Sequence, residues 1–428
     1  MVKDGYIQIQ YGDKVVEVDI PEKSIIACPS IKDVEKISDI KSELLKSLRN
    51  PVGSLPLYDV AKGRKNAVVV IPDITRPMPT STLLHIILDE LNAGGLEDCN
   101  IKAIIALGTH RPMTQREILN MVGQDVLSRI EVKNHAWNDE KQLVCLGRTA
   151  NGTWIDVNRE VYEADLVIGL SSVKPHRGAG WSGGAKIIDP GVCGQRTIGG
   201  THYLTVDFAI DEVTGVLDNP IRREIEDVAK KVGLEFSINL VLNRKDEVAF
   251  ISSGNTFLSH KRAVEFAERI FRVPQTEKGD FLICGAGGWA PDFWTSVQGI
   301  FPAEYLVKDG GTVAIFTPCP EGIAKEHPQI EEYGYRRVTD IKEMVSRGII
   351  TDLAAAGHMA AVSRVVIEKN IECIVVSDKS NKQSFESLGL MWMETPQAAV
   401  DYILNKHHNA RGYVFPVKSI TDTVVIPW

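Results

Sequence analysis

One seventeen-residue stretch combines five glycines with a histidine, a tryptophan and a lysine; it reads HRGAGWSGGAKIIDPGV and begins at His176. Glycine tolerates positive φ and lets a backbone approach a flat ligand closely. Lysine forms covalent bonds to cofactors when its amine is deprotonated, and histidine carries protons or binds metals near neutral pH. The stretch therefore predicts a loop beside a flat group, with His176 and Lys186 as its reactive residues and Gly183 and Gly184 in its backbone.

Residues of similar chemical types lie in three other short segments. PDITRP contains Asp73 and Arg76, GTHRPM contains His110, and GGTHY contains His202. Carboxylates, guanidinium groups and imidazoles can move protons or bind anionic substrates. A single residue of this kind is usually structural, so the prediction of a site depends on whether the fold brings these residues together.

The glycine pattern alone does not identify a nucleotide fold. Residues 178–183 satisfy G-x-G-x-x-G, but IGGTHY occupies the region where the acidic ribose partner is expected, about 20 residues later. Lys186 also lacks the preceding glycine and the following Ser or Thr of a P-loop. We therefore expect neither a standard dinucleotide site nor a P-loop.

Short apolar runs alternate with helical patterns after about residue 65, which is typical of a doubly wound α/β layer. The expected strands are 65–71, 101–107, 130–132 and 166–170, and the expected helices are 82–91, 115–122 and 259–271. A β-hairpin is predicted before them, over residues 6–10 and 15–20. Ligands bind beyond the carboxyl ends of strands in such sheets, and PDITRP, GTHRPM and the glycine-rich stretch each follow a strand.

A polar segment near residue 275 predicts a domain boundary. We expect a catalytic and cofactor-binding α/β domain over residues 1–272 and an α/β domain that contributes to substrate binding over 273–409, with parallel-rich sheets and a cleft between them. Residues 410–428 could return to the first domain. Expected strands of the second domain are 280–284, 311–316 and 373–377, and its expected helices are 295–307, 340–346 and 396–404.

Composition and charge exclude several classes of protein. The net charge is −8, and no dense Lys/Arg cluster with interleaved aromatic residues is present, which argues against nucleic-acid binding. The start of the chain lacks the apolar block of a signal peptide, and no apolar run approaches about 18 residues, so we expect a cytoplasmic protein outside the membrane. The seven cysteines contain no CxxC pattern and are expected to be free thiols. The expected partner is a small molecule.

The chain resembles the nickel-pincer-nucleotide lactate racemase family through four ordered motifs: PDITRP, GTHRPM, KPHRGAGWSGGAKIIDPGV and GGTHY. The resemblance implies that the cofactor, nickel pyridinium-3,5-bisthiocarboxylic acid mononucleotide, is attached through a thioamide to Lys186. It also implies that His202 is the protein ligand of the nickel. Soft sulfur ligands with an imidazole suit nickel. Asp73, Gly183 and Gly184 are the further residues expected to contact the cofactor.

The resemblance also implies an isomerase that racemises or epimerises a 2-hydroxy acid. His110 and His176 would be its acid/base pair, and Arg76 would pair with the substrate carboxylate. One histidine would take the hydroxyl proton while hydride leaves C2 for the cofactor, and the hydride would return to the other face. Separate maturation proteins would make the cofactor. The oligomeric state stays open.

One segment departs from the lactate enzymes of that family. They use a glutamine and, three residues later, a lysine toward the substrate, whereas GAGGWAPDFWTSVQG places Thr295 and Gln298 at these positions. Gln298 donates hydrogen bonds without a full positive charge, and the neighbouring Trp294 offers an aromatic surface. We therefore expect a substrate larger than lactate, either a sugar (aldonic) acid or an aryl-lactate.

Two alternatives stay open at the level of sequence. A zinc-dependent hydrolase would use His110, His176 and His202 around an activated water, but it would leave Lys186 without a role. A non-catalytic cofactor-binding protein would carry the lysine adduct without turnover.

Overall fold

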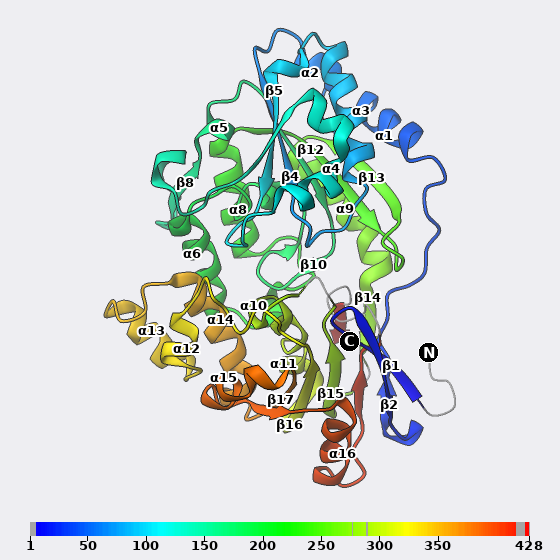
Figure 1. Cartoon of the computed structure of the whole chain (residues 1–428), viewed down its shortest axis with the longest axis vertical. Helices are drawn as coiled ribbons and strands as arrows, with labels where there is room; N and C mark the ends of the chain where they lie inside the picture. The colour runs from blue at the N-terminus through cyan, green and yellow to red at the C-terminus, as the bar shows by residue number, and fades with distance from the viewer. Residues whose placement is uncertain (1–5, 276, 288–289, 417–423, 428) are drawn as a thin grey trace. The chain divides into compact units, whose positions relative to one another are not determined.

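The computed structural model describes residues 6–275, 277–287, 290–416 and 424–427 (Figure 1). The chain divides into two compact units, and each is an α/β unit with its own sheet. Unit 1 comprises Met1–Ile31, His202–Gly215 and Phe271–Trp428, and unit 2 comprises Lys32–Thr201 and Val216–Ile270. The parallel-rich α/β class predicted from the sequence is confirmed for both units.

The division of the chain differs from the predicted linear one. The predicted boundary after residue 272 lies beside the junction at 270/271. However, residues 1–31 and 202–215 belong with the C-terminal part of the chain, in unit 1. The first segment is held there because β3 (Ile25–Ala27) pairs with β19 (Gly412–Val414), and in the second the Ile210 N–H donates to the Glu304 carboxylate. The pairing of β3 with β19 joins residues 412–414, in the segment predicted to return to the first domain, to residues 25–27, which the prediction had also placed in that domain; both lie in unit 1.

The sheet of unit 2 has six strands in the order β13-β12-β9-β4-β5-β6. All its pairings are parallel except that of β13 with β12. The strands are β4 Ala67–Pro72, β5 Ile101–Ala106, β6 Glu131–Asn134, β9 Val167–Ser172, β12 Leu234–Leu242 and β13 Val248–Gly254. The four strands predicted for this part of the chain correspond to β4, β5, β6 and β9 and are confirmed. Every residue of β4 is buried, as expected for a central strand covered on both faces.

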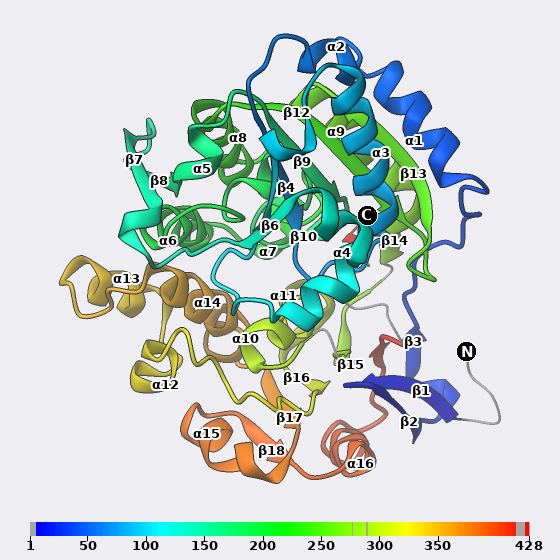
Figure 2. The same ribbon diagram turned by 45° about the horizontal axis from the view of Figure 1, so that its top comes forward.

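Helices cover both faces of this sheet. They are α1 Ile40–Arg49, α2 Leu57–Ala61, α3 Thr80–Ala93, α4 Gln115–Arg129, α5 Arg159–Tyr162, α8 Pro220–Val232 and α9 Thr256–Phe271, together with α6 Gln195–Tyr203, which ends at the unit junction. Leucines and isoleucines of α1 to α4 pack with one face of the strands in a single core cluster. Figure 2 shows α1 and α3 on one side of the sheet and α5 and α8 on the other.

Local sequence explains where α4 begins and why its prediction ended early. Thr114 caps the helix, and Glu117 accepts from the Thr114 N–H at 2.7 Å, which completes a capping box. Gly123 then adopts φ 80° and interrupts the helix before it continues to Arg129. The predicted helix 115–122 is therefore the first part of α4.

The sheet of unit 1 is parallel, with the strand order β18-β17-β16-β15-β19-β3. Besides β3 and β19, its strands are β15 Gly279–Gly285, β16 Val307–Phe316, β17 Glu372–Val376 and β18 Met391–Met393. The predicted hairpin is confirmed as the antiparallel pair of β1 (Tyr6–Tyr11) and β2 (Lys14–Asp19). Near the end of the chain, β20 (Val424–Pro427) pairs with β14 (Arg272–Gln275).

One predicted helix of unit 1 is wrong in its extent. Instead of a single helix over 295–307, the chain forms α10 Phe293–Ser296, the short turn η6 Val297–Gly299 and α11 Ala303–Leu306. Pro302 lacks an amide hydrogen and starts a new helix, so the regular pattern cannot continue. The other helices of unit 1 are α7 Ile210–Val213, α12 Gln329–Tyr333, α13 Val338–Ser346, α14 Leu353–Ser363, α15 Lys382–Ser387 and α16 Pro396–Lys406.

Candidate active site

His110 and Asp73 form a hydrogen-bonded pair at the carboxyl ends of neighbouring strands. Asp73 follows β4, His110 follows β5, and these strands pair in parallel. The Nδ1 atom of His110 lies 2.6 Å from Oδ2 of Asp73. A carboxylate only accepts hydrogen bonds, so Nδ1 carries a proton, and in the neutral form of the ring the lone pair lies on Nε2. The pair therefore fixes the tautomer in which Nε2 is the base.

Asp73 is buried but ionised. Burial acts to raise the pKa of its carboxyl, but the hydrogen bond and charge of His110, the charge of Arg76 and the Thr75 hydroxyl outweigh it and lower the pKa to about 2. The Thr75 N–H donates to Asp73 Oδ1 at 3.1 Å. Asp73 is thus a positioning residue for His110, a role that the sequence did not predict; its predicted contact with the cofactor stays a prediction.

Arg76 ends the same turn and lines a cavity. Its N–H donates to the Asp73 carbonyl at 3.1 Å, and Nη1 donates to Thr75 Oγ1 at 2.9 Å. The cavity has a volume of about 270 Å³ and is lined by Asp73, Ile74, Arg76, Pro77, Met78, Thr80, Glu117, Asn120 and Met121. A guanidinium carries five donors, so Arg76 can hold the turn and still bind an anion on the cavity side.

Lys186 lies in η4 (Gly184–Ile187), the single turn after the glycine pair. Loss of hydration lowers the pKa of its amine to about 7. The positive charges of Arg76 and Arg222 act in the same direction, whereas the negative charges of Asp189 and Asp73 oppose it. At neutral pH a large fraction of the amine is therefore uncharged and nucleophilic.

Asp189 is a second buried ionisable group of unit 2, three residues after Lys186. Its side chain is fully buried, Thr201 Oγ1 donates to Oδ1 at 3.3 Å, and Oδ2 has no hydrogen-bond partner among the described residues. Burial raises the pKa of this carboxyl to about 7, against the lowering effects of Thr201 and Lys186. Asp189 was not among the predicted site residues, although it lies in the same glycine-rich stretch as Lys186.

The glycines before Lys186 allow close packing within unit 2. Gly183 and Gly184 have φ of 84° and 56°. A Cβ atom on Gly183 would lie 2.6 Å from the Val173 side chain, and one on Gly184 would lie 2.8 Å from the His260 ring. The loop therefore needs glycine here for its own packing, and the predicted approach of these two residues to a ligand stays a prediction.

His176 lies on a two-residue strand before the glycines. It belongs to β10 (Pro175–His176), which pairs with β11 (Gly180–Trp181). Its Nδ1 accepts from the Gly178 N–H at 3.1 Å. In the neutral ring the proton must then sit on Nε2, the opposite tautomer to that of His110.

The residues predicted to contact the substrate lie on α10 and η6 of unit 1. The buried residues of this segment are Phe293, Ser296, Val297 and Gly299. Trp294, Thr295 and Gln298 are the three that remain partly exposed. Asp292 caps α10, since the N–H and Oγ1 of Thr295 both donate to its Oδ1, at 2.9 and 2.6 Å.

Two imidazoles fix the orientation of Trp294. Its indole stacks with His327 at a ring distance of 3.9 Å and with His358 at 5.0 Å. His327 Nδ1 lies 2.7 Å from Asp352 Oδ2, and Tyr335 Oη lies 3.3 Å from His358 Nε2. No sequence pattern predicts this cluster, because its members come from separate elements.

His202 lies near the end of α6 and belongs to unit 1, whereas Lys186 belongs to unit 2. Thr205 Oγ1 donates to the His202 carbonyl at 2.6 Å. A Cβ atom on Gly357 would lie 2.7 Å from the same oxygen, so α14 packs closely against this turn. The structure thus brings Asp73, Arg76 and His110 together in unit 2, where the charges of Asp73 and Arg76 also act on Lys186, and it assigns His202 to unit 1.

Two broader observations concern metals and membranes. Within the described parts of the chain, no three His, Cys, Asp or Glu side chains are grouped as a metal site of protein ligands would require. No described helix is both long and apolar enough to cross a membrane.

The chain is similar to named lactate racemases over most of its length. The lactate racemase N-terminal domain family matches residues 11–215. A lactate racemase from Thermoanaerobacterium thermosaccharolyticum is 30% identical over 390 residues, covering 88% of each chain. A lactate racemase from Lactiplantibacillus plantarum is 30% identical over 309 residues, covering 72% of each chain.

Solved structures share the fold. The lactate racemase apoprotein from Thermoanaerobacterium thermosaccharolyticum matches with a TM-score of 0.84 and 26% identity, over 98% of this chain and 100% of that one. A protein from Thermotoga maritima matches with a TM-score of 0.74 and 20% identity, over 93% and 100% of the two chains. The chain belongs to the lactate racemase family and is an isomerase.

Proposed function

We propose that this isomerase inverts C2 of a 2-hydroxy acid by reversible hydride transfer to a nickel-pincer nucleotide attached covalently to Lys186. The observation that carries the proposal is the amine of Lys186, whose pKa is lowered to about 7 by loss of hydration and by neighbouring positive charge. A lysine that only neutralised a phosphate would gain by keeping its proton. A lysine that forms a bond to carbon needs the free base.

The donor groups of the chain suit the cofactor chemically. When bound, the nickel-pincer nucleotide supplies a hydride acceptor and donor. His202 would give one imidazole nitrogen to the nickel, and the remaining ligand atoms would come from the cofactor, so the protein needs no cluster of three ligands. A zinc hydrolase does need such a cluster, and the described residues give it no support.

The tautomers of His110 and His176, both in unit 2, suit opposite proton transfers. His110, with its Nδ1–H on Asp73, presents a lone pair at Nε2 that can take the hydroxyl proton of the substrate. His176, with Nδ1 accepting from Gly178, carries its proton on Nε2 and can return it to the carbonyl oxygen when the other enantiomer forms. Arg76 would pair with the substrate carboxylate from the cavity that it lines.

We further propose that the substrate is larger than lactate. The partly exposed residues of α10 and η6 are Trp294, Thr295 and Gln298, and none of them carries a positive charge. Gln298 can hydrogen-bond hydroxyl groups, which favours a sugar (aldonic) acid over an aryl-lactate. Trp294 is already stacked with two imidazoles, so it would act as a fixed wall.

Mass spectrometry tests the attachment. Protein produced together with cofactor-maturation proteins is expected to carry a covalent adduct on the peptide containing Lys186. Lys186→Arg, which keeps the charge, should carry none. Unmodified wild-type protein that holds zinc and hydrolyses its substrate would reject the proposal in favour of the hydrolase.

Chiral chromatography then tests the reaction. The adduct-bearing protein is incubated with lactate, malate, phenyllactate and aldonic acids, and inversion at C2 is expected for at least one acid larger than lactate. Adduct without inversion of any acid would indicate a cofactor-binding protein. Inversion of lactate alone would contradict the proposed substrate class.

A further inference from the structure

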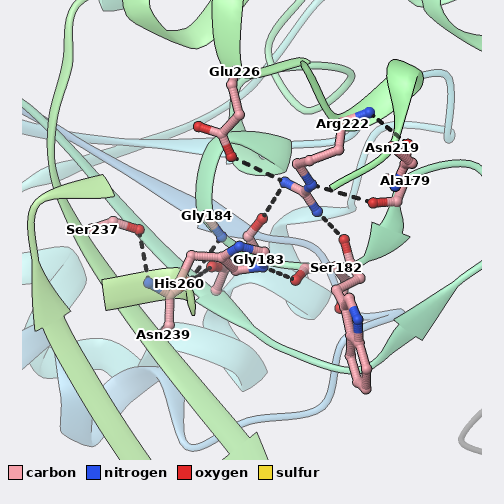
Figure 3. Close-up of polar contacts among 12 residues, drawn as sticks. Ala179, Ser182, Gly183, Gly184, Asn219, Arg222, Glu226, Ser237, Asn239 and His260 are labelled. Atoms are coloured by element: carbon pink, nitrogen blue, oxygen red, sulfur yellow. Dashed lines mark hydrogen bonds and ion pairs between the residues drawn. The ribbon is translucent and has the colours of Figure 1, made fainter. Parts of the chain in front are cut away.

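A buried arginine binds the backbone of the glycine-rich loop through hydrogen bonds. Arg222 is the third residue of α8, and only 2% of its side chain is exposed. Its Nε donates to the Ala179 carbonyl at 3.2 Å, its Nη1 donates to the Gly183 carbonyl at 3.3 Å, and its Nη2 donates to the Trp181 carbonyl. Figure 3 shows the guanidinium facing the carbonyls of Ala179 and Gly183. One side chain thus binds three alternate peptide groups of the loop between His176 and Lys186.

Two other buried side chains also form hydrogen bonds with the backbone of this loop. His260 Nε2 donates to the Ser182 carbonyl at 2.8 Å, and the Gly184 N–H donates to Asn239 Oδ1, also at 2.8 Å (Figure 3). The loop also lies directly on the segment before α8, since a Cβ atom on Gly180 would lie 1.9 Å from the Val216 carbonyl oxygen. These contacts restrict the conformations open to the backbone that leads into η4.

The charge of Arg222 needs its own explanation, because neutral donors could also bind carbonyl oxygens. Burial of a guanidinium is costly unless it is paired, and Arg222 Nη1 forms only a long ion pair, 3.6 Å, with Oε1 of Glu226. The positive charge of Arg222 acts on the Lys186 amine and lowers its pKa.

The other charged groups that act on this amine are Arg76, which works in the same direction, and Asp189 and Asp73, which oppose it. The two arginines come from different elements, the turn after β4 and the start of α8. The buried Arg222 therefore holds the loop through hydrogen bonds, and its positive charge favours loss of the proton from the Lys186 amine.

We propose that Arg222 is a positioning residue for Lys186: its guanidinium fixes the loop through three carbonyls, and its buried positive charge disfavours a second positive charge on the Lys186 amine. This inference rests on the proposed covalent role of Lys186. It assigns a chemical task to a residue outside every motif of the sequence, 36 positions after the lysine.

The test measures lysine reactivity in the protein without cofactor. Wild type, Arg222→Met and Arg222→Lys are labelled with acetic anhydride between pH 5 and pH 10, and the acetylation of Lys186 is followed by peptide mass spectrometry against the exposed Lys325. In Arg222→Met the pH midpoint for Lys186 is expected to rise. Labelling at pH 6 should fall about tenfold for each pH unit of that rise.

Amide hydrogen exchange separates the effect of the three hydrogen bonds from the effect of the positive charge of Arg222. Arg222→Lys keeps a positive charge but cannot span three carbonyls in a planar fork. We expect faster amide exchange over residues 179–187 in both variants, with the larger midpoint shift in Arg222→Met. Arg223→Met is the matched control, since the neighbouring Arg223 is exposed and pairs with Asp218, and both readouts should stay at wild-type values.

Two outcomes would overturn the proposal. A folded Arg222→Met with the wild-type midpoint would overturn it, and so would wild-type exchange of the loop in Arg222→Lys, the variant to use if Arg222→Met does not fold. Neither readout needs the cofactor or turnover. Failure of the proposed function, seen as absence of an adduct on Lys186, is therefore distinguishable from failure of this inference.

Discussion

Replacing Asp73 with asparagine tests whether the pairing with His110 serves the reaction. The variant keeps the size of the side chain but removes the charge. If the amide oxygen stays on the Thr75 N–H, its NH₂ group faces His110 Nδ1, where a donor now meets a donor. His110 must then move its proton to Nε2, which destroys the lone pair that the proposed mechanism uses as base.

The size of the effect follows from the structure. The pKa of Asp73 is about 2 instead of the ordinary 3.8, even though burial acts to raise it. This difference corresponds to about 2 kcal/mol of stabilisation of the carboxylate by its partners, of which His110 is the first. A charge-assisted hydrogen bond is typically worth about 1.5 to 3 kcal/mol. Loss of about 2 kcal/mol during proton transfer lowers kcat about 30-fold.

The assay is inversion at C2 by adduct-bearing protein, with whichever acid of the panel reacts. We expect kcat of Asp73→Asn to fall about 30-fold with little change in KM, because Asp73 acts through His110. Asp125→Asn, an exposed carboxylate on α4, is the control for charge removal and should keep wild-type kcat. Wild-type kcat in Asp73→Asn, with the Lys186 adduct intact, would refute the proposed role of the pair.

Two further predictions concern substrate choice and acid stability. Gln298→Lys restores a positive charge on the partly exposed face of η6, and we expect the ratio of kcat/KM for lactate to that for larger acids to rise about tenfold; an unchanged ratio would remove Gln298 from the substrate site. Burial is the main cause that lowers the pKa of His135 to about 4 and that of His260 to about 3, so the unfolded chain binds protons below pH 6.5 that the folded chain does not. The free energy of unfolding, measured with urea, should therefore be constant with respect to these groups above about pH 6.5. It should decrease by about 1.4 kcal/mol per pH unit for each histidine from pH 6 to pH 5, and an equal slope in the double glutamine variant would contradict this reasoning.

The strands and the motif positions could be predicted because they depend on local pattern. Four apolar runs became β4, β5, β6 and β9, and the motifs PDITRP and GTHRPM follow β4 and β5. Parallel pairing of β4 with β5 then brings Asp73 next to His110. The sequence analysis placed both residues at one sheet edge, but it paired neither with the other because side-chain contacts depend on register.

The residues that support the site could not be predicted from local pattern. Arg222 and His260 hold the glycine-rich loop from α8 and α9, and neither belongs to a recognisable motif. The assignment of residues 1–31 and 202–215 to unit 1 depends on nonlocal pairing such as that of β3 with β19. Long-range contacts of this kind leave no periodic signal in the chain.

Lys186 and Asp189 both follow the glycine pair and both titrate near neutral pH. This explains how the site can permanently lose the positive charge of the lysine amine. Burial lowers the pKa of Lys186 to about 7 and raises that of Asp189 to about 7, so near neutral pH the pair can be ionised or neutral with no change in its total charge. A thioamide on Lys186 would remove the positive charge permanently, and with it one of the two groups that lower the pKa of Asp189, the other being Thr201. Asp189 would then take up a proton at neutral pH. An ordinary carboxylate would instead have to stay charged, buried and unpaired, at a cost of several kcal/mol.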